Sequence, residues 1–292
     1  MQKTLDRLLT CLAWLSGGGT LLAVSLLLVF LASHGMPGID AALFFGDTPW
    51  LDALLARKPI FGGIWPALVG TFSLVFLASV FSIPLGIASG IYLAEYASDH
   101  RHSLLDFMVD LLSGTPSIVM GLFGFTAILA LRKTFLPGAR TGLLLAGLCI
   151  GLLVLPYVIR TTESALEGIP DHLRLLGPSL GLTRWQNINK VLLPLAGRGI
   201  LSGAILAVGR AAEDTAVILL TGVVAHAGIP GSLADKFEAL PFRIYYLAAE
   251  HRSPQELEQG FATALVLLLL TGLLFLAAVL LQRSVERRWK TR

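Results

Sequence analysis

The sequence predicts an all-α membrane protein with six transmembrane helices. Of its 292 residues, 55% are hydrophobic and only 14% are charged, whereas soluble domains have about 45 to 50% and about 25%. The chain also contains six apolar runs of the length, about 20 residues, that a helix needs to cross a bilayer. A water-soluble enzyme is therefore excluded. With no soluble basic domain to bind a phosphate backbone, nucleic acid is excluded as a partner.

The first crossing is expected to be a retained anchor. Lys3 and Arg7 precede an apolar core, as in a secretory signal. The apolar stretch is too long for a signal peptide, however, and no small-residue cleavage site follows it. The six expected crossings, in chain order, are 11–33, 66–94, 104–131, 142–165, 192–224 and 261–282.

Two of the next crossings contain features that affect helix packing. The second carries Gly86 and Gly90, whose spacing is typical of close helix pairs. The third contains GTPSIVMGLFG at 114–124. This string predicts either a simple helix kink or backbone groups that face protein or a water-filled cavity.

The segments between the crossings are expected to be ordered. Residues 34–65 and 225–260 contain Gly, Pro and aromatic residues, as in external loops or short re-entrant pieces. Residues 167–191 mix polar and apolar side chains around Gly177, Pro178 and Gly181. We expect two short helices joined by a turn in this internal segment.

Lys and Arg residues set the expected orientation. They are more frequent in the flanks on the side that holds the N-terminus, and the tail RSVERRWKTR contributes to that excess. By the positive-inside rule both termini are cytoplasmic. The expected organisation is an anchor helix with an external segment (1–65), a transmembrane domain (66–282) whose cytoplasmic loop is 167–191, and a basic tail (283–292).

GRAAEDTA, residues 209–216, places charge deep inside the fifth crossing. An ionisable side chain there costs at least about 2.5 kcal/mol, which indicates a function. Arg210 and Asp214 share a helical face, and Glu213 lies within one turn. One interpretation is an ion pair that only neutralises itself. The other is a guanidinium that meets an oxyanion in a polar cavity, with the acids holding it in place.

A second charged cluster, YVIRTTESALEG, occupies residues 157–168. Arg160 could bind an anion there, or it could extend its side chain to the inner surface of the membrane. Glu163 lies three residues further on, and Thr161 and Thr162 offer hydroxyls to an oxyanion. Two arginines on different helices favour an anion path.

Other chemistries lack their motifs. The sequence has no HExxH and no Walker A pattern, so neither metal-dependent hydrolysis nor ATP binding by this chain is expected. Cys11 and Cys149 lie in apolar stretches without ligand partners nearby, so we expect packing roles and no metal site. Transport is the class that remains.

The stretch GLTRWQNINKVLLP, 181–194, resembles the cytoplasmic loop of ABC importer permeases. Gly181, Leu193 and Pro194 match the family pattern, which begins with Glu-Ala-Ala. Its first three positions are here Leu175, Leu176 and Gly177. The resemblance implies that this loop docks on an ATPase.

Further strings resemble the PstA-type permeases of phosphate-specific (Pst) importers. They are PLGIASGIYLAEYA, GTPSIVMGLFG, YVIRTTESAL, GRAAEDTAVILLTG and ALPFRIYYLA. The resemblance implies a type I ABC importer permease fold in a bacterial plasma membrane. It also implies a PstC-type permease as heterodimer partner, a homodimeric ABC ATPase that holds ATP and magnesium, and a periplasmic phosphate-binding protein. Family arginines of the path map onto Arg160 and Arg210, while Glu213 and Asp214 replace the usual Gly-Glu.

The expected function is inward conduction of inorganic phosphate. Arg160 and Arg210 replace part of its hydration, and the neighbouring acids keep that binding transient. For ATPase coupling the candidate residues are Leu173, Gly181, Leu182, Arg184, Trp185 and Pro194, although ordinary packing within the loop would also explain them. Two alternatives remain open: another tetrahedral oxyanion as cargo, and a non-transporting scaffold of a phosphate-sensing complex.

Overall fold

The computed structural model describes residues 2–54 and 62–290. In this part of the chain, six helices are long and apolar enough to cross a membrane. The helices are α1 (Gln2–Gly35), α2 (Ala41–Phe45), α3 (Trp50–Leu54), α4 (Trp65–Glu95), α5 (Asp99–Ser113), α6 (Ser117–Thr134), α7 (Leu143–Glu167), α8 (Asp171–Arg174), α9 (Leu176–Ser179), α10 (Arg184–Asn187), α11 (Leu193–Glu213), α12 (Ala216–Thr221), α13 (Leu240–Glu250) and α14 (Pro254–Lys290), with a π-helical turn at Ile188–Leu192.

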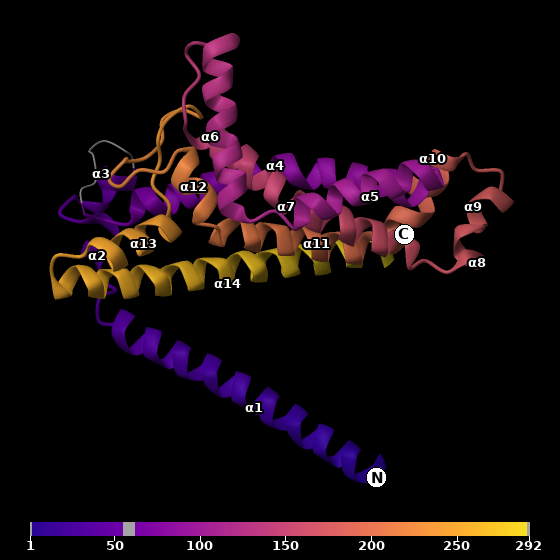
Figure 1. The fold of residues 1–292 in the computed structure, drawn as a ribbon, viewed down its shortest axis with the longest axis horizontal. Coiled ribbons are helices and arrows are strands. Elements are labelled where there is room, and N and C mark those ends of the chain that lie inside the picture. Colours follow the sequence, from indigo (N-terminus) through magenta and orange to yellow (C-terminus); the bar gives the residue numbers. More distant parts are fainter. Residues whose placement is uncertain (1, 55–61, 291–292) are drawn as a thin grey trace.

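The long helices α4, α7, α11 and α14 form an elongated bundle with α5 alongside it (Figure 1). The short helices α8, α9 and α10 lie at one end of this bundle, and α2, α3 and α13 lie at the other. The free ends of α1 and α14 both point toward the α8 to α10 end. Helix α1 diverges from the bundle, and its residues from Leu5 to Phe30 are exposed. It meets α14 near Phe30, whose ring centroid is 5.7 Å from that of Phe261.

The core is centred on α7, which is the most buried of the candidate spans. Its inward face packs against α4, α11 and α12 through Ala78, Ile150, Val154, Ala207 and Val217. Apolar burial of this kind contributes nothing in lipid on its own, so close packing of small residues holds the helices together. Gly86 and Gly90 of α4 lie directly against α7, which confirms the packing role predicted for them. A Cβ on Gly90 would lie 2.6 Å from the Cβ of Thr162 and 2.8 Å from the carbonyl oxygen of Ile159.

Gly90→Val should therefore separate α4 from α7. The added side chain meets backbone that cannot rotate away, so the expected cost is about 1 to 3 kcal/mol. The measurement is thermal unfolding of the purified assembly in detergent. Gly272→Val on the exposed side of α14, where a Cβ would have nothing within 4 Å, is the control. An unchanged unfolding temperature for Gly90→Val would contradict the packing argument.

The predicted third crossing, 104–131, is wrong as a single helix. The chain breaks at Gly114 to Pro116, where α5 ends and α6 begins, and Figure 1 shows α6 at a steep angle to the bundle. Proline lacks an amide donor and disfavours helical backbone in the residue before it. Pro116 itself has a polyproline-type backbone, with φ of −59° and ψ of 140°. The change of direction between α5 and α6 is larger than the helix kink that the sequence predicted.

The predicted fifth crossing, 192–224, is also interrupted. Helix α11 ends at Glu213, and Asp214 has an extended ψ of 120° before the short helix α12. Asp214 accepts a hydrogen bond from the amide of Val217 at 3.0 Å, so its buried carboxylate supplies a cap to α12. A capping acid favours a break of this kind because it satisfies an amide that has no helical partner.

The remaining predicted segments correspond to helices at the same positions in the chain, but the bounds or the number of these helices differ. The other four crossings coincide with α1, α4, α7 and α14, and the one at 142–165 begins one residue before α7. The segment 167–191 forms three short helices and the start of a π-helical turn, where two helices were expected. The expected basic tail, 283–292, continues α14 as far as Lys290, and its last two residues lie outside the described part of the chain.

Candidate functional site

Arg160 lies near the end of α7 with its guanidinium held by carboxylates. Its Nη1 donates to Oδ1 of Asp106 and, at 3.0 Å, to Oε2 of Glu163. Its Nη2 donates to Oδ1 of Asp110 and, at 3.3 Å, to the backbone oxygen of Asp106. The terminal nitrogens carry four N–H groups, and these four bonds occupy them. We call Arg160, Asp106, Asp110 and Glu163 the α5–α7 clasp.

The sequence identified one of the three acids in the clasp. Glu163 is nearly buried, with 5% of its side chain exposed, while Asp106 and Asp110 come from α5 and were not singled out. Their signal in the sequence is a polar stripe that starts at His102 and recurs every four residues. It was missed because residues 104–131 were interpreted as one apolar crossing. The guanidinium of Arg160 is bound by acids of α5 and α7, and the alternative in which it extends to the membrane surface stays a prediction.

The clasp also brings metal-binding residue types together. Ligand atoms of His102, Asp106 and Glu163 lie within 4.8 Å of one another, and Nε2 of His102 is 3.1 Å from Oε1 of Glu163. Nη1 of Arg160 contacts both carboxylates. A guanidinium therefore already holds the position that a cation would take, and we assign the cluster to Arg160.

The two threonines beside Arg160 lie in helix contacts. Thr161 donates to the carbonyl oxygen of Tyr157 at 2.7 Å and packs against Gly203 of α11. Thr162 is buried against Gly90 of α4, and its hydroxyl has no hydrogen-bond partner among the described residues. The structure places them on two sides of α7 and does not gather them around the guanidinium of Arg160.

Arg210 is held far more loosely than Arg160. Its side chain is 44% exposed, and its ion pair with Oδ2 of Asp214 is 3.6 Å long. Asp214 is buried and also caps α12, whereas Glu213 is exposed at the end of α11. A guanidinium in this setting keeps donors available for an anion.

The structure does not bring the two arginines together. Thr161 of α7 lies against Gly203 of α11, so Arg160 is level with that part of α11. Arg210 lies seven residues further along the helix, which corresponds to about 10 Å at 1.5 Å per residue. The two guanidiniums occupy different depths along the bundle and have different acidic partners.

Two contacts attach the α8 to α10 segment to the end of α4. Nη1 of Arg174 lies 2.5 Å from Oε1 of Glu95, and its Nη2 donates to the carbonyl oxygen of Leu166 at 2.6 Å. The guanidinium of Arg184 lies 4.7 Å from the ring centroid of Tyr96, which is within cation–π range. The side chain of Arg184, a predicted coupling residue, therefore contacts a residue of its own chain.

The predicted coupling residues differ in exposure. Leu173 packs against the core and Leu182 is half-buried, whereas Trp185 is 59% exposed. Gly181 has a φ of 75°, a conformation that side chains disfavour, and Pro194 occupies the first turn of α11. The sequence missed three further exposed leucines in this segment, Leu175, Leu176 and Leu180. We refer to these three and Trp185 together as the apolar patch.

The opposite end of the bundle holds a buried ion pair. Arg243 of α13 lies 3.1 Å from Glu238 and donates to the carbonyl oxygen of Gly62, and both ionic side chains are almost fully buried. In the loop before them, hydrogen bonds from the hydroxyl and amide of Ser232 lower the pKa of the Asp235 carboxyl. These contacts order a segment that the sequence predicted to be an ordered loop.

Six helices long and apolar enough to cross a membrane make this chain a multi-pass membrane protein, and the arginine side chains on two of them suit a permease. The chain belongs to the family of binding-protein-dependent transport system inner membrane components, whose model matches residues 82–291. This confirms the resemblance that its motifs indicated.

Curated relatives named phosphate transport system permease proteins are similar over most of the chain. PstA 1 of Mycobacterium tuberculosis is 32% identical over 231 residues, which are 78% of this chain and 73% of the relative. PstA of Haemophilus influenzae is 30% identical over 249 residues, with 85% and 83% covered. PstA of Xylella fastidiosa is 38% identical over 193 residues, with 65% and 63% covered.

Solved structures confirm the predicted fold. The chain resembles an inward-facing conformation of the MetNI methionine ABC transporter with a TM-score of 0.58 at 21% identity, covering 82% of this chain and 99% of that one. It also resembles an amino acid ABC transporter with a TM-score of 0.52 at 16% identity, with the same coverage. The fold is that of type I ABC importer permeases.

Proposed function

We propose that this chain is the permease subunit that conducts inorganic phosphate inward across a bacterial plasma membrane, driven by ATP hydrolysis on a partner ATPase. The observation that carries the proposal is the similarity to PstA proteins at 30 to 38% identity over most of the chain. Arg210, lightly paired and 44% exposed inside an apolar helix, supplies chemistry that suits an oxyanion. Both termini are cytoplasmic in this proposal.

The partners follow from the family and from the surfaces of this chain. A PstC-type permease completes the path as a heterodimer, and a periplasmic phosphate-binding protein delivers the ion. A homodimeric ABC ATPase, which holds ATP and magnesium, docks on the α8 to α10 segment. The apolar patch of Leu175, Leu176, Leu180 and Trp185 supports this docking site, because exposed apolar patches on ordered segments mark protein contacts.

In this mechanism the two arginines act in sequence. Arg210 receives phosphate, mostly the dianion near neutral pH, and replaces part of its hydration. Asp214 and Glu213 limit the affinity there, because an ion that binds too tightly would not leave. Arg160 offers a second position about 10 Å further along the bundle, next to Glu163.

Uptake into proteoliposomes that contain the complete complex and its binding protein tests the function. Phosphate should accumulate when ATP is present on the ATPase side, and sulfate or a phosphonate in excess should not compete. Vanadate, which arrests ABC ATPases, is the control. Uptake of sulfate or phosphonate in place of phosphate would assign another oxyanion, and no transport by a complex with active ATPase would indicate a scaffold.

A further inference from the structure

Helix α5 lies between the ATPase-docking segment and the guanidinium of Arg160. We propose that Asp106 and Asp110 of α5 are positioning residues that withhold Arg160 from phosphate, and that movement of α5 releases it. The inference rests on the proposed function, and it adds a way to regulate Arg160, the second arginine of the proposed phosphate path. Three observations carry it: the occupied donors of Arg160, the limited packing of α5, and the contacts between the docking segment and the end of α4, directly before α5.

The α5–α7 clasp leaves Arg160 unable to bind an anion in bidentate fashion. All four hydrogen bonds of its terminal nitrogens end on Asp106, Asp110 or Glu163. Three carboxylates around one guanidinium also give the site a net negative charge, which repels an incoming phosphate. An anion can use this arginine only after at least one acid has moved.

The three acids are not equivalent. Glu163 is on the same helix as Arg160, three residues away and nearly buried, so it stays with the arginine. Asp106 and Asp110 are four residues apart on one face of α5 and are 36% and 64% exposed. Withdrawal of α5 would remove both at once and leave Arg160 paired with Glu163 alone, a neutral pair with free donors.

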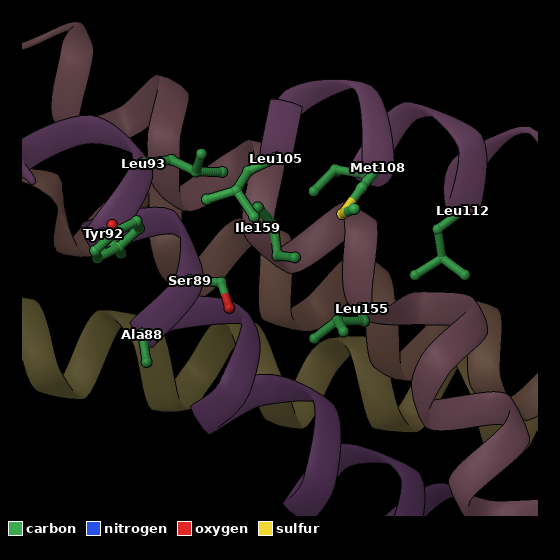
Figure 2. Close-up of a pocket in the computed structure, with 10 residues that line it drawn as sticks. Ala88, Ser89, Tyr92, Leu93, Leu105, Met108, Leu112, Leu155 and Ile159 are labelled. Atoms are coloured by element: carbon green, nitrogen blue, oxygen red, sulfur yellow. The ribbon is translucent and has the colours of Figure 1, made fainter. Parts of the chain in front are cut away.

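Helix α5 has limited packing against its neighbours. An apolar pocket of about 480 Å³, open to the surroundings, lies between α4, α5 and α7, and Figure 2 shows Leu105, Met108 and Leu112 of α5 facing Leu155 and Ile159 of α7 across it. Beside this pocket a small apolar cluster that includes Val109 joins α5 to α4 and α7. The clasp and this cluster together hold α5 in place, so removing the charges of the clasp should weaken that hold.

The docking segment contacts the chain just before α5 begins. Arg174 binds Glu95, and Arg184 stacks on Tyr96, at the end of α4. Helix α5 starts at Asp99. A displacement of the segment by the ATPase would act on the end of α4, from which residues 97 and 98 lead directly into α5.

The first experiment removes the two charges without changing side-chain shape. Equilibrium binding of radiolabelled inorganic phosphate to the nucleotide-free complex should strengthen by about tenfold in Asp106→Asn/Asp110→Asn. The KM and kcat for uptake should both fall, because phosphate is retained on a freed Arg160. Asp99→Asn, in the first turn of the same helix, is the matched control and should change nothing.

The same binding measurement shows whether the aspartates act through Arg160. In an Arg160→Gln background the double substitution should no longer strengthen phosphate binding. Unchanged affinity in the original background, or a gain that persists with Arg160→Gln, overturns the inference. Asp110→Asn alone, at the most exposed acid, should shift affinity in the same direction and serves if the double variant does not assemble.

A second experiment needs no phosphate and so separates this inference from the proposed function. Spin labels at Ser103→Cys on α5 and Ser164→Cys on α7, both exposed, report the distance between the helices once Cys11 and Cys149 are replaced by serine. Binding of ATP to the complex should lengthen this distance. An equal distance with and without ATP would overturn the inference that α5 moves to release Arg160. A complex that moves α5 but takes up no phosphate would contradict only the proposed function.

Discussion

Arg210→Ala should reduce phosphate uptake by at least about tenfold while the complex still assembles, because a charge-assisted hydrogen bond contributes about 1.5 to 3 kcal/mol. The side chain is 44% exposed, and among the residues that the structure describes its ion pair is the long one with Asp214. Its removal therefore takes away a ligand for the anion and little packing. The measurement is initial uptake into proteoliposomes, with assembly confirmed by co-purification of the partner subunits.

Two variants separate anion binding from charge balance at Arg210. Arg210→Lys keeps the charge but loses the planar fork, and it should restore only part of the uptake. Arg210→Ala/Asp214→Asn removes the acid that the first change leaves unpaired, and it should assemble as well as the original chain without regaining transport. Arg140→Ala, an exposed arginine outside the crossings, is the matched control. Normal uptake by Arg210→Ala would remove this arginine from the path.

Gly181→Asp should uncouple ATP hydrolysis from transport. Gly181 follows Leu180, which is 79% exposed, in the apolar patch of the docking segment. A Cβ there would meet nothing within the chain, so an aspartate would project toward the ATPase. A carboxylate buried against apolar groups without a partner costs several kcal/mol, and the complex should either lose its ATPase or hydrolyse ATP without moving phosphate.

Gly181→Asn controls for the backbone, because asparagine and aspartate both tolerate a positive φ. It should retain most of the coupling, so that the difference between the two variants reports the charge. Gly138→Asp, at another position where a Cβ would have open space, should behave like the original chain. The measured quantity is phosphate transported per ATP hydrolysed. An unchanged ratio for Gly181→Asp would place ATPase docking elsewhere on the surface.

Hydropathy was sufficient to locate four of the six crossings within single helices. It misjudged the other two because average hydropathy does not register backbone breaks. Leu104 to Leu131 is apolar enough to cross, yet Pro116 cannot continue the helix from Gly114. Asp214 was identified as an intramembrane charge, but its capping of α12 depends on where its carboxylate points.

The sequence by itself determined the membrane class, the family and the placement of Arg160 and Arg210 within apolar helices. These properties follow from local composition and from short motifs. Only the tertiary structure decided what each arginine contacts. Asp106 and Asp110 lie 54 and 50 residues before their partner Arg160, and they meet it because α5 folds back along α7 after the break at Pro116 separates it from α6. The free energy of a charge inside the bundle depends on these distant partners, and no local pattern encodes them.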